Sequence, residues 1–173
     1  SEVRSGLRNG EFILFLQPQV QLPDRTMVGA EALVRWQHPQ RGLLSPGYFL
    51  PYLRDSPTEI LLGKEVLRRG VEALAEMKHS FGRAARLSIN LSAGHFLDES
   101  FQDDLRWLEE LPRTAVEGLC FEVLETSFFD DIDRAIRVLQ TCRDIGINVA
   151  IDDFGTGYSS LSYLHQLPCN EFK

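Results

Sequence analysis

Two adjacent acids, Asp152 and Asp153, end a short apolar run that reads "NVAI". Side by side the two carboxylates repel each other, and the cost of that repulsion rises as water leaves. No Lys or Arg stands beside them in the segment "NVAIDDFGTGYSSL". A bound cation would supply the missing positive charge. The pair therefore indicates a metal site.

Three other polar residues interrupt strand-like segments: Glu31 in "MVGAEALV", Asn90 in "LSINLS" and Glu122 in "LCFEVL". Asn90 and Glu122 are 32 residues apart, and Glu122 and Asp152 are 30 apart. Each interval is about one strand-plus-helix unit. Equivalent positions on successive parallel strands meet at the carboxyl-terminal face of the sheet. We therefore expect these residues to converge there, with Glu31 joining them.

The expected cluster contains carboxylate and amide oxygens, with no His or Cys ligand. Such oxygen donors suit Mg²⁺ or Mn²⁺ better than zinc. Two metal ions about 3.5–4 Å apart need a bridging ligand and more than one carboxylate. The neighbouring Asp152 and Asp153 are suited to supply that bridge.

Some of these residues also have a structural interpretation when taken singly. A Glu in a strand is often paired with an Arg, and Arg35 is a candidate partner for Glu31. An Asn in a strand, such as Asn90, is often a core amide with its hydrogen bonds satisfied.

The same holds for the remaining acids. Glu122 and Glu125 fit a solvated strand edge. Asp152 and Asp153 before Gly155 fit turn chemistry and a helix N-cap. The regular spacing on successive strands favours the metal site over these alternatives.

The elements that must position these residues alternate between strand-like and helix-like patterns. A short turn makes the first strand pair antiparallel, and later crossovers give a largely parallel sheet. Pro18 indicates an edge strand or a β-bulge, and Gly146 indicates a helix C-cap. One α/β domain over residues 1–173 is expected. We expect strands at 11–22, 27–36, 85–92, 118–125, 147–152 and 170–173, a turn at 23–26, a broken helical stretch at 45–55, and helices at 59–77, 99–111, 131–146 and 158–167.

Composition is that of an ordinary globular domain. The 173 residues are 43% hydrophobic and 25% charged, and the net charge of −7 argues against a nucleic-acid polymer as partner. Cys120 and Cys142 lie in apolar patterns and indicate buried thiols in the reducing cytoplasm. No apolar run is long enough to span a membrane, and the N-terminus is no signal peptide. The four histidines lack ligand-like spacing and are expected on the surface or in loops: His38, His79, His95 and His165.

Several motifs, in order and spacing, resemble the EAL domain of bacterial cyclic di-GMP phosphodiesterases. They are "EALVRW", "INLS", "FEVLE", "DDFGTGYSSLSYL" and the final Lys of "NEFK", with "QPQV" and "SPGYFLP" in support. The resemblance implies a modified TIM (β/α)8 barrel with an antiparallel first strand. It also implies hydrolysis of one phosphodiester bond of cyclic di-GMP to linear pGpG by metal-activated water. Two ions, Mg²⁺ or Mn²⁺, are the implied cofactors.

The resemblance also assigns roles to residues. Metal ligands would be Glu31, Asn90, Glu122, Asp152 and, for the second ion, Asp153. Catalysis would fall to Glu31, Asp153 and Lys173, the last holding the attacking water.

Substrate contacts would come from Gln17, to a guanine edge, and Arg35, to a phosphate. Glu125 would anchor a loop formed by Phe154, Gly155, Thr156 and Gly157. By itself, Arg35 also fits a structural salt bridge, and Lys173 a surface lysine.

The sequence departs from the family pattern at several places. Leu124 stands where the family usually has Thr in "E-x-T-E", Leu53-Arg54 where it often has "AE", and Asn170 where it usually has Asp. A complete barrel of this type takes about 250 residues. We therefore expect the last two strands, and further site residues, to lie beyond Lys173.

Two alternatives to a phosphodiesterase remain open. The first is a regulatory domain that binds cyclic di-GMP without hydrolysis. The second is another barrel enzyme with acid ligands, such as a Mg²⁺-dependent lyase. Expected partners are cyclic di-GMP, regulatory domains in the parent protein, and a second copy through the DFGTG loop region.

Overall fold

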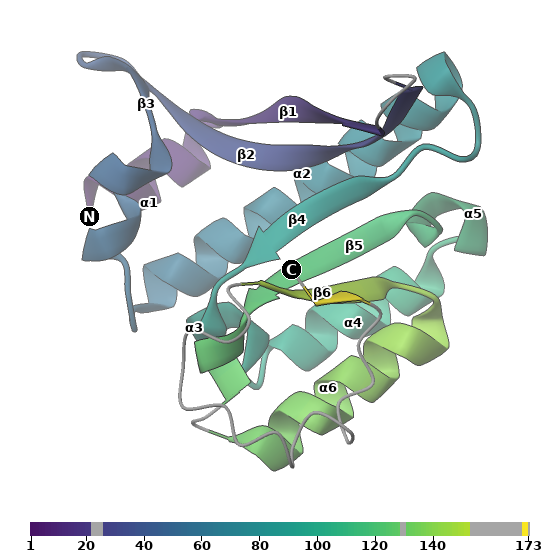
Figure 1. Ribbon diagram of the computed structural model, residues 1–173. Helices are drawn as coiled ribbons and strands as arrows, with labels where there is room; N and C mark the ends of the chain where they lie inside the picture. The colour runs from purple at the N-terminus through teal and green to yellow at the C-terminus, as the bar shows by residue number, and fades with distance from the viewer. Residues whose placement is uncertain (22–25, 129–130, 153–170, 173) are drawn as a thin grey trace. The chain divides into compact units, whose positions relative to one another are not determined.

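The computed structural model describes residues 1–21, 26–128, 131–152 and 171–172 (Figure 1). The chain divides into two compact units, Ser1–Ile89 and Asn90–Lys173. Each unit combines strands with helices, so the chain is α/β.

The first unit is built on a mixed sheet. Strand β1 (Phe12–Gln21) pairs antiparallel with β2 (Thr26–His38), and β3 (Gly42–Leu44) pairs antiparallel with the end of β2. On its other side, β2 pairs in parallel with β4 (Leu87–Leu91). The register of β1 shifts between Gln19 and Val20, beside Pro18, as expected for a bulge. The antiparallel first pair predicted from the sequence is confirmed.

Helix α2 (Pro57–Phe81) covers one face of these strands. Ser56 caps its first turn by accepting a hydrogen bond from the Glu59 backbone N–H, and the Glu59 carboxylate accepts one from the backbone N–H of Asp55, the residue before the cap. The buried stripe of the helix contains Leu62, Val66, Leu67 and Leu74, as their spacing predicts. Two short 3₁₀ turns, η1 (Pro46–Tyr48) and η2 (Leu50–Tyr52), form the broken helical stretch.

Gly70 marks the closest approach of α2 to the sheet. A Cβ at this position would overlap Cδ1 of Ile89 in β4. Ile89 is fully buried and has little freedom to move aside. Glycine here lets the helix backbone lie directly on the strand.

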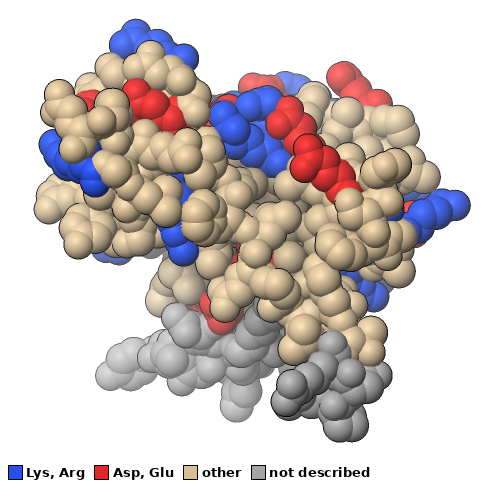
Figure 2. Space-filling view, turned by 90° about the horizontal axis from the view of Figure 1, so that it is seen from above, with Lys and Arg blue, Asp and Glu red and all other residues tan. Residues whose placement is uncertain are grey.

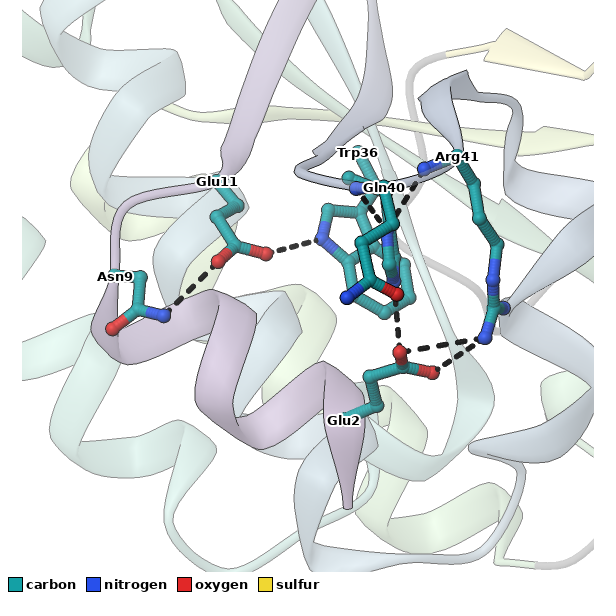
Figure 3. A network of polar contacts seen from close by, with 7 residues as sticks. Glu2, Asn9, Glu11, Trp36, Gln40 and Arg41 are labelled. Atoms are coloured by element: carbon teal, nitrogen blue, oxygen red, sulfur yellow. Dashed lines mark hydrogen bonds and ion pairs between the residues drawn. The ribbon is translucent and has the colours of Figure 1, made fainter.

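Helix α1 (Glu2–Arg8) is an element that the sequence analysis did not predict. Figure 3 shows the contacts that tie it to β2. The Glu2 carboxylate accepts a hydrogen bond from His38 at 2.9 Å and pairs with Arg41 at 3.1 Å. The His38 Nδ1 atom accepts from the backbone N–H groups of Gln40 and Arg41, which leaves Nε2–H as the donor to Glu2. These contacts lower the pKa of Glu2, the His38 hydrogen bond most of all.

The second unit is built on parallel strands. Strand β5 (Leu119–Leu124) pairs with β6 (Asn148–Asp152), which pairs with β7 (Glu171–Phe172). Helices α4 (Phe101–Glu110) and α6 (Ile132–Ile145) pack against one face of these strands. Phe101 of α4 contacts Phe121 of β5, with ring centroids 6.2 Å apart. Shorter elements complete the unit: α3 (Ala93–Phe96), α5 (Arg113–Val116) and η3 (Glu125–Phe128).

Helix α6 has both caps that its sequence indicates. The Asp131 side chain accepts from the Arg134 N–H, and Gly146 takes a left-handed conformation with φ of 93°.

Cys142 is fully buried on this helix, and burial raises the pKa of its thiol to about 12. Cys120 is only half-buried, and no disulfide forms among the described residues.

The surface placement expected for the histidines is wrong for two of them. His38 and His95 are buried, with 4% and 0% of their surface exposed. Each ring contacts a carboxylate, Glu2 for His38 and Asp104, at 2.8 Å, for His95. A histidine that is buried against a carboxylate distant in the sequence leaves no pattern of spacing that would predict its burial. His79 is exposed as predicted, and the expected helix at 158–167, which contains His165, lies outside the described residues.

The turn expected at residues 23–26 also falls largely on positions that the structure does not describe. Within the described ranges, no helix has both the length and the apolar character needed to cross a membrane.

The packing at Gly70 leads to a stability prediction. Replacing Gly70 with Ala should lower the free energy of unfolding by about 1–2 kcal/mol, because so close an overlap with a buried side chain costs about 2–3 kcal/mol, in the upper part of the range for overpacking, and the gain in helix propensity is only about 1 kcal/mol. Chemical denaturation of both proteins measures this difference. Gly47→Ala is the control, because a Cβ there would meet no atom within 4 Å. Equal stability of Gly70→Ala and the native protein would contradict the close packing.

The lowered pKa of Glu2 predicts how its contribution depends on pH. The carboxylate should stabilise the fold fully above its ordinary pKa of 4.5, and this contribution should disappear as pH falls through the lower pKa of the folded state. Glu2→Gln should therefore be less stable than the native protein at neutral pH, and the difference should disappear once pH falls below the pKa of Glu2 in the folded state. Denaturation midpoints at several pH values test this. The control is Glu110→Gln, at the exposed end of α4, which should show no such pH-dependent difference.

Candidate active site

Gln17 and Glu31 lie opposite each other in the β1–β2 ladder. Arg35 is four residues further along β2 than Glu31, so its side chain leaves the same face of the strand. On the other side of β2, Glu31 pairs with Ser88 of β4. The first unit therefore brings Gln17, Glu31 and Arg35 onto one face of its sheet.

The opposite face of the same strands is apolar. Ala30 and Ala32 are buried there and pair with Leu87 and Ile89, and Ile89 is the residue that Gly70 of α2 approaches. Since successive side chains of a strand alternate, the residues that pack on α2 and the candidate site residues must lie on opposite faces. Packing against the helix thus directs the polar side chains away from it.

The structural alternative required an ion pair between Arg35 and Glu31, and the structure does not show one between them. In the described part of the chain its guanidinium lies 5.5 Å from the ring centroid of Phe15 and donates to the Val34 carbonyl at 2.9 Å. Neither contact neutralises the guanidinium charge. Arg35 therefore keeps its charge and its planar fork available for an anion.

Glu122 and Asp152 share one face of the β5–β6 pair in the second unit. In the register, Glu122 pairs with Ala150 and Leu124 with Asp152. Phe121 and Val123, which alternate with them, face α4 and are buried. Glu122 is only 4% exposed, so the solvated strand edge considered for it is wrong. Asp152, the last residue of β6, is half-buried.

Three further residues complete the description of the candidate site. Glu125 begins η3 directly after β5 and is 7% exposed, so the solvated edge is wrong for it as well. Asn90, the fourth residue of β4, is exposed, which argues against a core amide. Leu124, where a hydroxyl residue was expected by resemblance, is 47% exposed opposite Asp152.

Ser88 is a residue that the sequence analysis missed. It is 7% exposed and faces the same side of the sheet as Glu31, its register partner. The signal was present in "LSINLS", where Ser88 and Asn90 alternate with apolar residues. In a strand this period places both polar side chains on one face.

The expected metal ligands are not all placed. Asp153, the loop residues 154–157 and Lys173 lie outside the described residues, and Glu31 belongs to a different unit from the other ligands. Among the residues that are described, no three His, Cys, Asp or Glu side chains form a group suited to a metal ion. The donor chemistry of Glu122 and Asp152, two carboxylates on one strand face, nevertheless fits a hard divalent cation.

In both units the candidate residues occupy the strand face that points away from the helices. Asn90, Glu122 and Asp152 also lie at or near the carboxyl ends of β4, β5 and β6. This is where (β/α) folds carry their sites. The model of the EAL domain family matches residues 1–173.

The chain belongs to the EAL domain family. Two relatives of this EAL domain come from Pseudomonas aeruginosa. The bifunctional diguanylate cyclase/cyclic di-GMP phosphodiesterase MucR is 36% identical over 174 residues, covering 99% of this chain and 25% of MucR. The cyclic di-GMP phosphodiesterase NbdA is 36% identical over 172 residues, covering 99% of this chain and 22% of NbdA.

A solved structure of the MucR phosphodiesterase in complex with c-di-GMP is also similar to this EAL domain. It has a TM-score of 0.88 and 35% sequence identity, and the match covers 99% of this chain and 69% of that one. The fold class expected from the sequence, a modified TIM barrel of the EAL type, is thereby confirmed. The chain spans about a quarter of the length of the curated relatives described above.

Proposed function

We propose that this EAL domain hydrolyses one phosphodiester bond of cyclic di-GMP and releases linear pGpG. The observation that carries the proposal is the placement of Glu31, Glu122 and Asp152 on the strand faces opposite the helices, in a chain that matches the EAL family throughout. Relatives named as cyclic di-GMP phosphodiesterases support it.

The ligands that we propose for two divalent cations are Glu31, Asn90, Glu122, Asp152 and Asp153. All are oxygen donors, which favours Mg²⁺ or Mn²⁺. When bound, such ions would lower the pKa of a coordinated water and offset negative charge on phosphate oxygens. The burial of Glu122 strengthens its interaction with any cation, because little water screens it.

Other residues would bind the substrate and orient the reactants. Arg35 would hold a phosphate through its planar fork, and Gln17 would bond a guanine edge. Lys173 would hold the attacking water, and Glu125 would anchor the loop at 154–157. Of these, Gln17 and Arg35 share a sheet face with Glu31, which supports a substrate that spans them.

A second candidate function is binding of cyclic di-GMP without hydrolysis. The observation that favours it is Leu124, which presents an apolar, 47% exposed side chain opposite Asp152. A leucine offers no hydroxyl to hold the neighbouring loop. A loosely held loop would slow catalysis more than ground-state binding.

We further propose the cytoplasm as the location, regulatory domains in the parent protein, and a second copy of the chain as partner through the DFGTG loop region. The buried free thiol of Cys142 supports a reducing compartment. A nucleic-acid polymer is not an expected partner. On the face shown in Figure 2, Lys and Arg side chains occur in small groups beside Asp and Glu instead of forming a broad basic surface.

The proposed function predicts metal-dependent turnover. The parent protein should convert cyclic di-GMP to pGpG with Mg²⁺ or Mn²⁺ and lose activity in EDTA, with recovery when the metal is restored in excess. Chromatography of the nucleotide products measures this. Full turnover in EDTA would contradict the proposal, and tight binding without turnover in either metal would favour the receptor.

The proposed roles of two glutamates on adjacent elements can be separated. Glu122→Gln should weaken Mn²⁺ binding by at least about tenfold, because it removes a ligand, whereas Glu125→Ala should lower kcat with Mn²⁺ affinity unchanged within about twofold. Electron paramagnetic resonance of free Mn²⁺ gives the affinity. Proteolysis in the segment 153–158 should become faster only in Glu125→Ala. Loss of Mn²⁺ in Glu125→Ala would show that Glu125 is a ligand and not a loop anchor.

A further inference from the structure

Glu11 bonds to two successive residues of β2, and these follow directly after Arg35. Its carboxylate accepts a hydrogen bond from the Trp36 indole N–H at 2.8 Å. Its backbone carbonyl accepts from the Gln37 N–H at 2.8 Å. One residue outside the strand therefore fixes both the side chain and the main chain of this stretch of β2.

The Glu11 carboxylate is itself held at both oxygens. Asn9 donates its amide N–H to the second oxygen at 3.0 Å (Figure 3). The Glu11 backbone N–H donates to the Gly6 carbonyl at 2.9 Å. The bonds from Trp36 and Asn9 lower the pKa of Glu11, so the carboxylate is charged at neutral pH. A charged acceptor makes the stronger hydrogen bond to the indole.

Trp36 is enclosed and has no room to shift. It is 3% exposed, stacks on Phe12 at 5.1 Å and meets Phe49 edge-on at 5.9 Å. A Cβ at Gly6 would lie 2.9 Å from the indole nitrogen and 2.8 Å from the Glu11 carboxylate. Helix α1 therefore packs directly against the hydrogen bond between Glu11 and Trp36.

Arg35 leaves the opposite face of the same strand. Because neighbouring side chains of a strand project to opposite sides, the orientation of Trp36 sets the direction in which Arg35 projects. Among the described residues, the guanidinium itself has only the Phe15 ring and the Val34 carbonyl to hold it. The direction in which the guanidinium projects therefore depends on the backbone of β2 at Arg35.

We propose that Glu11 is a positioning residue for substrate binding, which acts through Trp36 to aim Arg35 at a phosphate of the substrate. The proposal rests on the proposed function, in which Arg35 binds that phosphate. Glu11 itself lies on the helix-covered side of β2 and touches neither substrate nor metal. Its loss should raise KM for cyclic di-GMP with little change in kcat.

Three variants of the full-length protein test the proposal. Glu11→Ala should raise KM about tenfold and change kcat by less than about twofold, because a misaimed phosphate-binding residue weakens substrate binding. Glu11→Gln keeps an oxygen acceptor for the indole N–H and should stay within about twofold of native KM. Trp36→Phe removes the donor and should raise KM as Glu11→Ala does.

Two controls separate positioning from a general loss of stability. Glu59→Ala also removes a carboxylate that accepts a hydrogen bond, in this case from the Asp55 backbone N–H at 2.8 Å, in the first turn of α2. Trp107→Phe makes the same ring substitution on α4. Both should leave KM unchanged even where the melting temperature falls.

A double-mutant cycle with Arg35→Ala gives the decisive comparison. If Glu11 acts through Arg35, adding Glu11→Ala to Arg35→Ala should not raise KM further. Independent, multiplicative effects of the two substitutions would overturn the proposal. So would a rise in KM for Glu59→Ala equal to that for Glu11→Ala.

Equilibrium binding of cyclic di-GMP in EDTA distinguishes failure of this inference from failure of the proposed function. Binding that Arg35→Ala weakens and Glu11→Ala leaves unchanged would overturn the positioning role alone. Native protein that neither binds nor hydrolyses cyclic di-GMP would overturn the proposed function, and the positioning role with it. Weaker binding in both variants, with native affinity in Glu11→Gln, is the expected result.

Discussion

The two-residue period of the strands is the constraint on which the rest of this structure depends. Each strand must present apolar side chains to the helices that cover it, as Ile89 does to α2 and Phe121 does to α4. Only the alternate positions are then available for polar chemistry. Glu31 and Glu122 occupy such positions in different units, and the same rule places each of them.

Local patterns in the sequence, including the two-residue period of the strands, explain why much of the fold could be predicted. The strand interrupted by Glu122 and the helix that ends at Gly146 have strong local signals, an apolar alternation and a glycine cap. Helix α1 was missed because it has seven residues with Gly6 in its middle, which is a weak helical pattern. Its stability comes from tertiary contacts such as the one between Glu2 and His38.

The candidate site was predictable in part, for a related reason. Polar residues in apolar strands identified Glu31, Asn90 and Glu122 before any fold was known, whereas the roles of Gln17 and Lys173 came only from resemblance to the family. The burial of His38 and His95 had no local signal, since their carboxylate partners lie 36 and 9 residues away in the sequence. Contacts of that kind become visible only when the chain is folded.

Burial of Glu122 shows what such a site costs the fold. A carboxylate that is 4% exposed loses most of its hydration, and an apolar side chain at the same strand position would avoid that loss. The neighbouring Phe121 and Val123 show that β5 is otherwise an ordinary core strand. A charged residue in this place is better explained by chemistry than by stability.

The buried thiol of Cys142 has a consequence for redox chemistry. With its pKa near 12, only about one molecule in 10⁵ carries the thiolate at neutral pH. Peroxides and disulfides react with the thiolate and not with the thiol. Helix α6, on which the β5–β6 strands rest, is thus protected from oxidants that would modify a more accessible cysteine.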